Sequence, residues 1–189
     1  MPPPGPSPLA DPQHPADLLL YRLAKLAAAS GRLVTRLCER RYGITRREWG
    51  VLMWLAQQPG LQPSALAERL ELDRARVSRA IASLQAKGLV HRAASPQHRS
   101  QAALHLTEAG TALHADLWPQ VRAINLQLTG VLGAEPLNQL DQDLAALQRQ
   151  AARLEQHDPH APDAAACYPP RREGSRHLGQ RRAPAPEHP

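Results

Sequence analysis

The sequence predicts one mainly α-helical domain that carries a small β-hairpin. Leucines recur at alternating spacings of three and four residues near both ends of the chain, which indicates long helices with narrow apolar seams. Between these seams, capping residues and glycine stops divide the chain into shorter helices. Two strand-length segments joined by a polar turn predict the hairpin.

Proline marks both ends of the chain as tails. Seven of the 19 prolines lie in residues 1–15 and seven in residues 159–189. Such segments bury too little apolar surface to offset the entropy lost on ordering. We therefore expect residues 1–16 and 158–189 to be disordered and residues 17–157 to form the folded domain.

The composition excludes several classes of protein. No window holds the roughly 18 consecutive apolar residues of a membrane span, and the N-terminus lacks the basic and apolar regions of a secretory signal. Two cysteines, Cys38 and Cys167, cannot make a disulfide framework. No pattern matches a catalytic triad, a phosphate-binding loop or paired carboxylates. We expect a cytoplasmic protein that is not an enzyme and has no cofactor.

The first two helices are predicted from their seams and caps. The first runs from Asp17 to about Arg41 and stops at Gly43. The second opens with the capping box of Thr45 and Glu48 and extends to about Gln57. The seam of the first helix comprises Leu19, Leu23, Leu26, Ser30, Leu33 and Leu37.

Two more helices and the hairpin follow. A short helix covers about Pro63–Leu70, and Asp73 is a good N-cap for a helix that runs to Lys87. Strands are expected over residues 89–94 and 101–106, with the turn between them. Thr107 caps a long helix to about Leu132, and a last helix carries Leu137, Leu140, Leu144, Leu147, Ala151 and Leu154 in its seam.

The seams indicate an oligomer. Burying one leucine stabilises a fold by roughly 1.5–3 kcal/mol, so an uncovered seam would be unfavourable. Packing within one chain is one way to cover the seams. Pairing with a second copy of the chain is favoured, because the three helices between the two seams offer little surface to cover both seams.

Charge is divided along the chain. Residues 22–99 hold 15 basic and 5 acidic side chains, whereas residues 100–157 hold 3 basic and 6 acidic ones. Arginine provides 21 of the 23 basic residues, and its planar fork suits phosphate and guanine. A basic segment beside an acidic one predicts a surface that faces a polyanion. Biased coding explains the choice of arginine but not this distribution.

The order helix, short helix, helix and hairpin is that of a winged helix-turn-helix domain. Its second motif helix would enter the major groove of DNA with its first residues against base edges. That helix opens with Asp73-Arg-Ala-Arg-Val-Ser-Arg79, so three arginines and a serine lie in its first two turns. A solvated charged face is the alternative, and the hairpin and the arginine bias argue against it.

The chain resembles the multiple-antibiotic-resistance regulator (MarR) family of bacterial transcription factors. The resemblance spans about Tyr21 to Leu154. It rests on the order and spacing of Leu66-Ala-Glu-Arg-Leu70, residues 77–84, Lys87-Gly-Leu-Val90 and Leu106-Thr-Glu-Ala-Gly110.

The resemblance implies a homodimer that binds a pseudo-palindromic operator in double-stranded DNA. Residues about 45–110 would form the DNA-binding lobe, and residues about 17–42 and 107–157 the dimerisation helices. By position, the residues that contact DNA would be Ser64, Arg74, Arg76, Ser78 and Arg79 on the helices, with Arg99 at the wing tip. The wing, Ser95-Pro-Gln-His-Arg-Ser100, departs from the family's common Asp-Pro-x-Asp-Arg-Arg pattern and lacks the acid that braces the wing arginine.

Many members of the family release DNA when they bind a small, often aromatic and anionic, molecule. Tyr21, Arg46 and Trp49 could line such an effector site by placement, and a role in the core is the alternative for the aromatic residues. Cys38 lies beside Arg36, Arg40 and Arg41, which could favour its thiolate and redox sensing. His157, His160 and Cys167 offer no closed spacing for a metal site.

The function expected is that of a sequence-specific transcriptional regulator, more often a repressor than an activator, released by a small ligand. A nonspecific architectural DNA-binding protein is one alternative. A ligand-binding dimer without DNA recognition is the other. Arg171, Arg172, Arg176, Arg181 and Arg182 of the C-terminal segment would add nonspecific affinity for DNA or remain solvated.

Overall fold

A computed structural model of the protein describes residues 7–94 and 102–157. Residues up to Gly133 form one compact unit, and the chain from Ala134 forms a second, so each is described by itself. The elements of the first unit are a 3-10 helix η1 (Pro15–Asp17), α1 (Leu19–Tyr42), α2 (Arg46–Gln57), α3 (Pro63–Leu70), α4 (Arg74–Ala86), β1 (Val90–Ala94), β2 (Ala102–Leu106) and α5 (Glu108–Thr129). The second unit contains α6 (Ala134–Gln156). No helix within the described ranges has the length and apolar character to cross a membrane.

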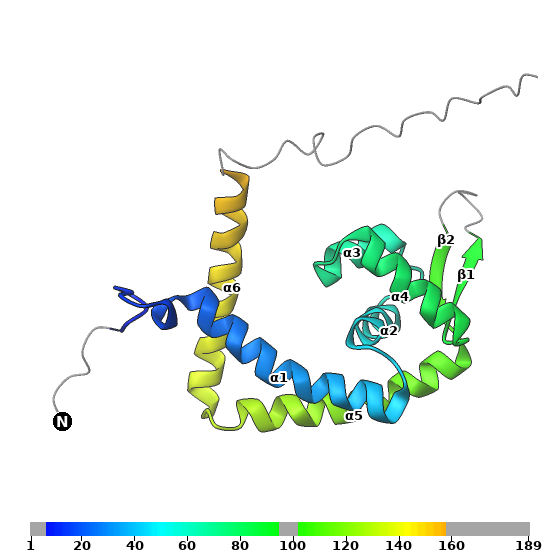
Figure 1. Ribbon diagram of the computed structural model, residues 1–189, viewed down its shortest axis with the longest axis horizontal. Coiled ribbons are helices and arrows are strands. Elements are labelled where there is room, and N and C mark those ends of the chain that lie inside the picture. The colour runs from blue at the N-terminus through cyan, green and yellow to red at the C-terminus, as the bar shows by residue number, and fades with distance from the viewer. Residues whose placement is uncertain (1–6, 95–101, 158–189) are drawn as a thin grey trace, which may run out of the picture. The chain divides into compact units, whose positions relative to one another are not determined.

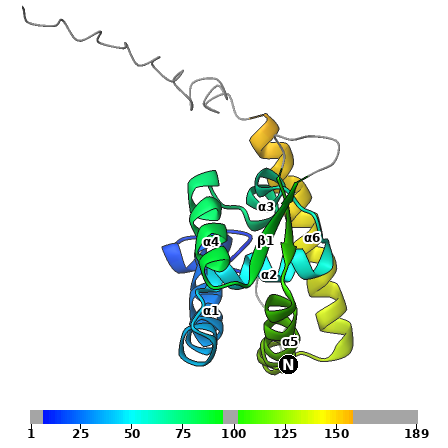
Figure 2. The ribbon, with the colours of Figure 1, turned by 90° about the vertical axis from the view of Figure 1, so that its right-hand side faces the viewer.

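The fold class predicted from the sequence is confirmed. Figure 1 shows α2, α3 and α4 gathered beside the β1–β2 hairpin, with α1 and α5 running below them. The two long helices α1 and α5 contact each other, and both contact α2. They therefore pack on one another and on the three-helix centre. In the view of Figure 2, the hairpin lies next to α4, with which β1 makes contact.

The segment before α1 differs from the sequence prediction. We expected disorder up to residue 16, but residues 8–10 form a turn and Pro15–Asp17 a 3-10 helix. The carboxylate of Asp17 accepts hydrogen bonds from the backbone N–H groups of Gln13 and His14, at 3.1 and 2.9 Å. Local hydrogen bonds therefore order a segment that composition alone predicts to be mobile. The tails at residues 1–6 and 158–189 lie outside the described residues.

Local capping chemistry sets the boundaries of the central helices. The Thr45 hydroxyl accepts from the Glu48 N–H at 3.2 Å, and the Glu48 carboxylate accepts from the Thr45 N–H, which confirms the capping box that begins α2. Asp73 accepts from the Arg76 N–H at 2.7 Å and caps α4. Gly43 ends α1 with φ of 62°, a left-handed conformation that favours glycine. Sequence therefore predicts these boundaries to within two residues.

The hairpin is antiparallel, with Val90 opposite Leu106 and Ala94 opposite Ala102. Leu104 pairs on its other side with Leu61, in the segment between α2 and α3. Its N–H donates to the Leu61 carbonyl at 3.1 Å, and its carbonyl accepts from the Gly60 N–H at 2.9 Å. The base of the wing is therefore fixed to the helical centre.

One apolar core holds the first unit together. It comprises Cys38, Ile44, Trp49, Val51, Leu52, Leu55, Leu61, Leu66, Ala67, Val77, Ala80, Ile81, Leu84, Leu89, Val90, Leu104 and Leu117. These residues come from all five α-helices of the unit, from both strands and from the connecting segments, so the core fixes α4 relative to its neighbours. At roughly 1.5–3 kcal/mol for each large side chain, this burial is the main force that holds the motif together.

The last helix, α6, has no buried residue within its own unit. Its seam leucines Leu140, Leu144 and Leu147 are 41, 37 and 42% exposed. Among the described residues of that unit, the predicted seam is therefore an exposed or half-buried stripe on one helix.

Candidate nucleic-acid interface

Helix α4 presents a basic face because its large apolar residues lie on the opposite side. Val77, Ala80, Ile81 and Leu84 are buried against the core. Arg74, Arg76, Ser78 and Arg79 are exposed. The helical period therefore sorts a mixed sequence into one face for packing and one for solvent or a ligand.

Few carboxylates neutralise this face. The Arg76 Nε atom lies 2.9 Å from the Asp73 Oδ2 atom, in a pair whose side chains are 51 and 54% exposed. Within residues 7–94 and 102–157, neither Arg74 nor Arg79 forms an ion pair. The beginning of α4 also contributes the positive end of its helix dipole. The face therefore carries unbalanced positive charge, as an anion-binding surface requires.

The structure places the predicted DNA-contacting residues on two helices. Arg74, Arg76, Ser78 and Arg79 lie together in the first two turns of α4, and Ser64 is the second residue of α3. Ser64 is half-buried. Arg99 lies outside the described residues. The helical part of the predicted site is thus brought together on adjacent elements of the motif.

A small cleft between α2 and α4 was not predicted. It has a volume of about 170 Å³ and is lined by Thr45, Arg47, Glu48, Arg76, Arg79, Ala80 and Ser83. Arg47 is the functional candidate that the sequence analysis missed. The capping box predicts that Arg47 lies in the first turn of a helix, and the N-terminus of a helix attracts anions. Nothing in the sequence indicated that Arg47 lies beside α4.

Glu48 is the carboxylate of this cleft, and both of its oxygen atoms already have hydrogen-bond partners. Lys87 Nζ lies 2.8 and 3.0 Å from its two carboxylate oxygens. Burial by itself raises the pKa of Glu48, but hydrogen bonds from Lys87, Ser83 and the Thr45 backbone, with the charge of Lys87, outweigh it and lower the pKa. Glu48 is therefore ionised and neutralised by Lys87 rather than by the arginines.

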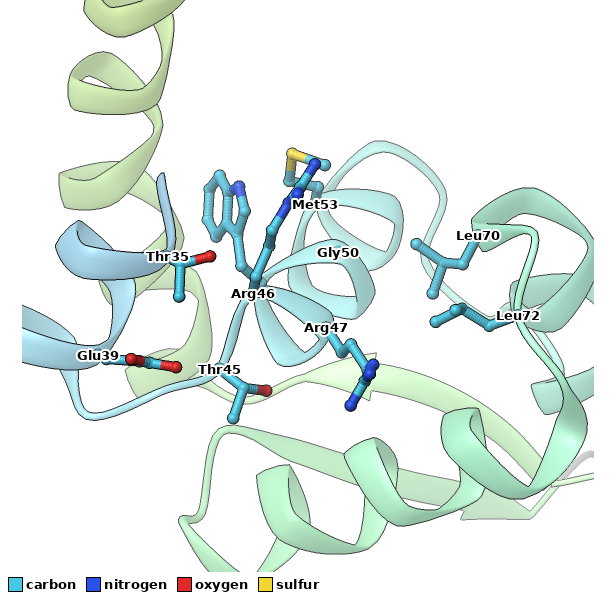
Figure 3. Close-up of a pocket in the computed structure, with 10 residues that line it drawn as sticks. Thr35, Glu39, Thr45, Arg46, Arg47, Gly50, Met53, Leu70 and Leu72 are labelled. Carbon is cyan, nitrogen blue, oxygen red and sulfur yellow. The ribbon is translucent and has the colours of Figure 1, made fainter. Parts of the chain in front are cut away.

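A larger cavity of about 630 Å³ lies where α1, α2 and the end of α3 meet (Figure 3). Its lining residues are Thr35, Glu39, Thr45, Arg46, Arg47, Trp49, Gly50, Met53, Leu70 and Leu72. Figure 3 shows Arg46 and Arg47 pointing to different sides of α2. The volume is in the range of small-molecule sites, and the lining combines apolar groups with two arginines and one glutamate.

The predicted effector residues are only partly in this cavity. Arg46 and Trp49 line it, but Tyr21 does not. Tyr21 is 46% exposed near the start of α1, with Lys25 Nζ 5.6 Å from its ring centroid. Tyr21 lies near one end of the long helix α1, whereas this cavity lies towards the other end, beside Thr35 and Glu39.

Trp49 belongs to the core as well as to the cavity wall. It is 2% exposed, and its ring stacks on His114 of α5 with 5.4 Å between centroids. His114 in turn stacks on Trp118 at 6.1 Å. Burial lowers the pKa of His114, so the neutral ring is favoured in this stack.

The cysteine and histidine residues weighed in the sequence analysis do not form a redox or metal site in the described part of the chain. Cys38 is fully buried, and burial raises the pKa of its thiol, with Glu39 adding to the effect and Arg46 opposing it. The suggestion that nearby arginines favour its thiolate is therefore wrong. His157 ends the described residues, and His160 and Cys167 lie beyond them. No cluster of three metal-ligating side chains occurs in residues 7–94 and 102–157.

A family model matches the part of the chain that carries the basic face of α4. The model of the MarR family matches residues 42–99. A putative transcriptional regulatory protein for the hcr operon of Thauera aromatica is 34% identical over 95 residues, which are 50% of this chain and 57% of that protein. The chain thus spans little more than half the length of this relative.

Solved structures share the fold over most of the chain. The transcriptional regulator SlyA matches with a TM-score of 0.65 at 18% identity, over 72% of this chain and 96% of that one. A MarR family regulator from Silicibacter pomeroyi matches with a TM-score of 0.62 at 24% identity, over 75% of this chain and 93% of that one. The chain is thus similar to the MarR family of transcriptional regulators over residues 42–99, and its described residues share the fold of these solved structures.

Proposed function

We propose that this protein binds specific sites in duplex DNA and regulates transcription. The observation that carries the proposal is the exposed face of α4, where Arg74 and Arg79 have no carboxylate partner among the described residues. A helix of this kind fits the major groove, and arginine can hydrogen-bond the edge of guanine there. The adjacent hairpin is in position to serve as a wing, and by resemblance Arg99 would reach the minor groove from it.

A homodimer is the form in which the protein would act. Leu23, Leu26 and Leu33 of α1 are 37, 52 and 45% exposed, and the leucines of the α6 seam are similarly uncovered. Monomeric soluble proteins rarely leave so much contiguous apolar surface in water. A two-fold symmetric dimer would present two recognition helices to a pseudo-palindromic operator, about one helical turn apart.

The larger cavity would hold the effector that releases DNA. Two arginines attract an anion, and Trp49, Met53 and Leu70 provide apolar contacts for a ring. A small aromatic carboxylate satisfies both requirements. Under this proposal the protein is a repressor, and the ligand lowers its affinity for the operator.

Gel-shift and anisotropy titrations test DNA recognition. The protein is titrated into the duplex upstream of its own coding sequence, with and without excess scrambled duplex. A shift that survives the competitor supports a specific regulator. A shift that the competitor removes indicates a nonspecific architectural protein, and no shift at any salt concentration indicates a ligand-binding dimer without DNA recognition.

Tryptophan fluorescence tests the effector site. Benzoate serves as the anionic probe, and neutral benzamide is its matched control. We expect saturable quenching by benzoate alone, and its loss in Arg46→Gln. Equal responses to both probes, or a benzoate response that survives Arg46→Gln, would show that the arginines of the cavity do not select an anion.

A further inference from the structure

Arg47 lies at the DNA-facing side of the motif, although it is not part of the recognition helix. It is the second residue of α2 and is exposed. Within the described residues it forms no ion pair. A long cationic side chain without a carboxylate partner is available for a ligand.

The small cleft brings Arg47 together with two arginines of α4. Arg76, Arg79 and Ser83 are spaced i, i+3 and i+7, so they share the side of α4 that faces Thr45 and Arg47 across the cleft. Three guanidinium groups and two hydroxyl groups therefore converge from two helices. In the sequence, Thr45 and Arg47 lie at least 29 positions before the lining residues of α4. Only the fold places the two sets together.

Charge and size define what the cleft can accept. Glu48 is neutralised by Lys87, and the Asp73 carboxylate contacts Arg76 at the exposed end of α4, so the cleft retains net positive charge. Its volume of about 170 Å³ is below the roughly 300–1,000 Å³ of small-molecule sites. One compact anionic group fits these limits, and arginine forks match the oxygen atoms of a phosphate.

We propose that the cleft between α2 and α4 binds one backbone phosphate of the DNA, and that Arg47 is a further DNA-binding residue. This inference rests on the proposed function and extends its interface from α4 to the beginning of α2. A phosphate held between two helices would fix the depth and angle of α4 in the groove without reading sequence. The beginning of α2 adds the positive end of a helix dipole.

Arg122 of α5 provides a matched control. It is exposed and, within the described residues, forms no ion pair. It lines neither the small cleft nor the larger cavity, whereas Arg47 lines both. The two arginines thus have the same charge, yet only Arg47 faces the proposed phosphate.

The test compares Arg47→Gln and Arg122→Gln with the unmodified protein, using operator and random duplexes over a series of salt concentrations. Each phosphate contact contributes about 0.9 to the slope of log K against log salt. We expect Arg47→Gln to lower the slope by about 0.9 per protomer and to weaken binding to both duplexes by similar factors. Arg47→Lys should retain the slope, and Arg122→Gln should leave it unchanged.

The outcomes separate the two proposals. If the unmodified protein binds DNA and Arg47→Gln keeps its slope and affinity, the phosphate site is wrong while DNA binding stands. A loss confined to the operator would also overturn it, because a phosphate contact is independent of sequence. If the unmodified protein binds no DNA, both proposals fail. Circular dichroism melting of each variant excludes misfolding as the cause of a loss.

Discussion

Lys87 Nζ lies 2.8 Å from Glu48 Oε1 and connects the end of α4 to the beginning of α2. The same ammonium group donates to the Gly43 carbonyl at 2.9 Å. Glu48 is 2% exposed, so its charge depends on these partners. Glu48 also closes the capping box of α2. One buried carboxylate therefore sets where α2 begins and holds the end of α4 beside that point.

Removing the cation should therefore destabilise the fold. Breaking a fully buried ion pair costs roughly 3–5 kcal/mol. The Lys87 side chain is 35% exposed, so water replaces part of its contact and we expect Lys87→Met to lower the free energy of unfolding by about 2 kcal/mol. Urea denaturation measures this change. The double variant Glu48→Leu/Lys87→Met should recover part of the loss. The coupling would be contradicted if the double variant lost as much free energy of unfolding as the two single variants together, or more.

His114 should make stability depend on pH. Its pKa in the folded protein is lowered by burial, whereas in the unfolded chain it is about 6.5. Acid therefore protonates the unfolded chain first, so the contribution of His114 is intact above about pH 6.5 and decreases as pH falls towards the folded pKa. Urea denaturation at pH 7.5 and 5.5 should show a smaller decrease for His114→Phe, which retains ring stacking. An equal decrease in both proteins would assign the dependence to other groups.

Sequence predicted those features that depend on short stretches of chain. Thr45, Asp73 and Thr107 each satisfy backbone N–H groups of the helix they begin, so the residue type and its spacing are sufficient to locate them. The burial of Val77 and Leu84 follows from the helical period in the same way.

The site was less predictable where it depends on contacts between distant segments. Arg47 and Arg79 line the same cleft only because α2 and α4 pack together, and no local sequence pattern predicts that packing. Trp49 likewise acquires its stacking partner, His114, from α5. Tyr21 was assigned to an effector site by resemblance, and the length of α1 separates it from the cavity that Arg46 and Trp49 line.

Gly110 tests the close packing of α5 on the base of the wing. A Cβ atom there would overlap the Leu89 carbonyl oxygen, which accepts from the Thr107 N–H at 3.1 Å. Helix propensity alone would make Gly110→Ala stabilising by up to about 1 kcal/mol. We expect the overlap to prevail and the free energy of unfolding to fall by about 1–3 kcal/mol. Thermal melting decides the sign, and a higher melting temperature would show that the neighbouring backbone yields at little cost.

The same experiment has a control in Gly43. A Cβ atom there meets nothing within 4 Å, and the cost of Gly43→Ala is limited to the left-handed backbone with φ of 62°. That strain is roughly 1–2 kcal/mol. If steric overlap dominates at Gly110, its variant should be the less stable of the two.

The leucine stripe of α6 should hold the dimer together. Leu144→Asp introduces a charge between Leu140 and Leu147, and we expect monomer or aggregate instead of dimer. Gln142→Asp, which adds the same charge to an exposed position outside the stripe, should remain dimeric. Light scattering measures the mass of each. If Leu144→Asp remains a dimer with unchanged melting, α6 does not form the interface.

The arginines of the motif helix and of the wing should contribute differently to DNA binding. Arg74 lies on the exposed face of α4 and does not line the small cleft, so it is available to reach a base edge. A base-contacting arginine provides roughly 1–3 kcal/mol of discrimination. Arg74→Ala should therefore reduce affinity for the operator more than affinity for random duplex. Arg99 would act through its charge and the width of the minor groove, since that groove carries a degenerate code. Arg99→Ala should weaken binding to both duplexes by similar factors and reduce the salt slope by about one phosphate's share. Titrations of both duplexes over a salt series measure these effects. Should Arg99→Ala abolish specificity while Arg74→Ala leaves it intact, the wing rather than α4 is the element that reads the sequence.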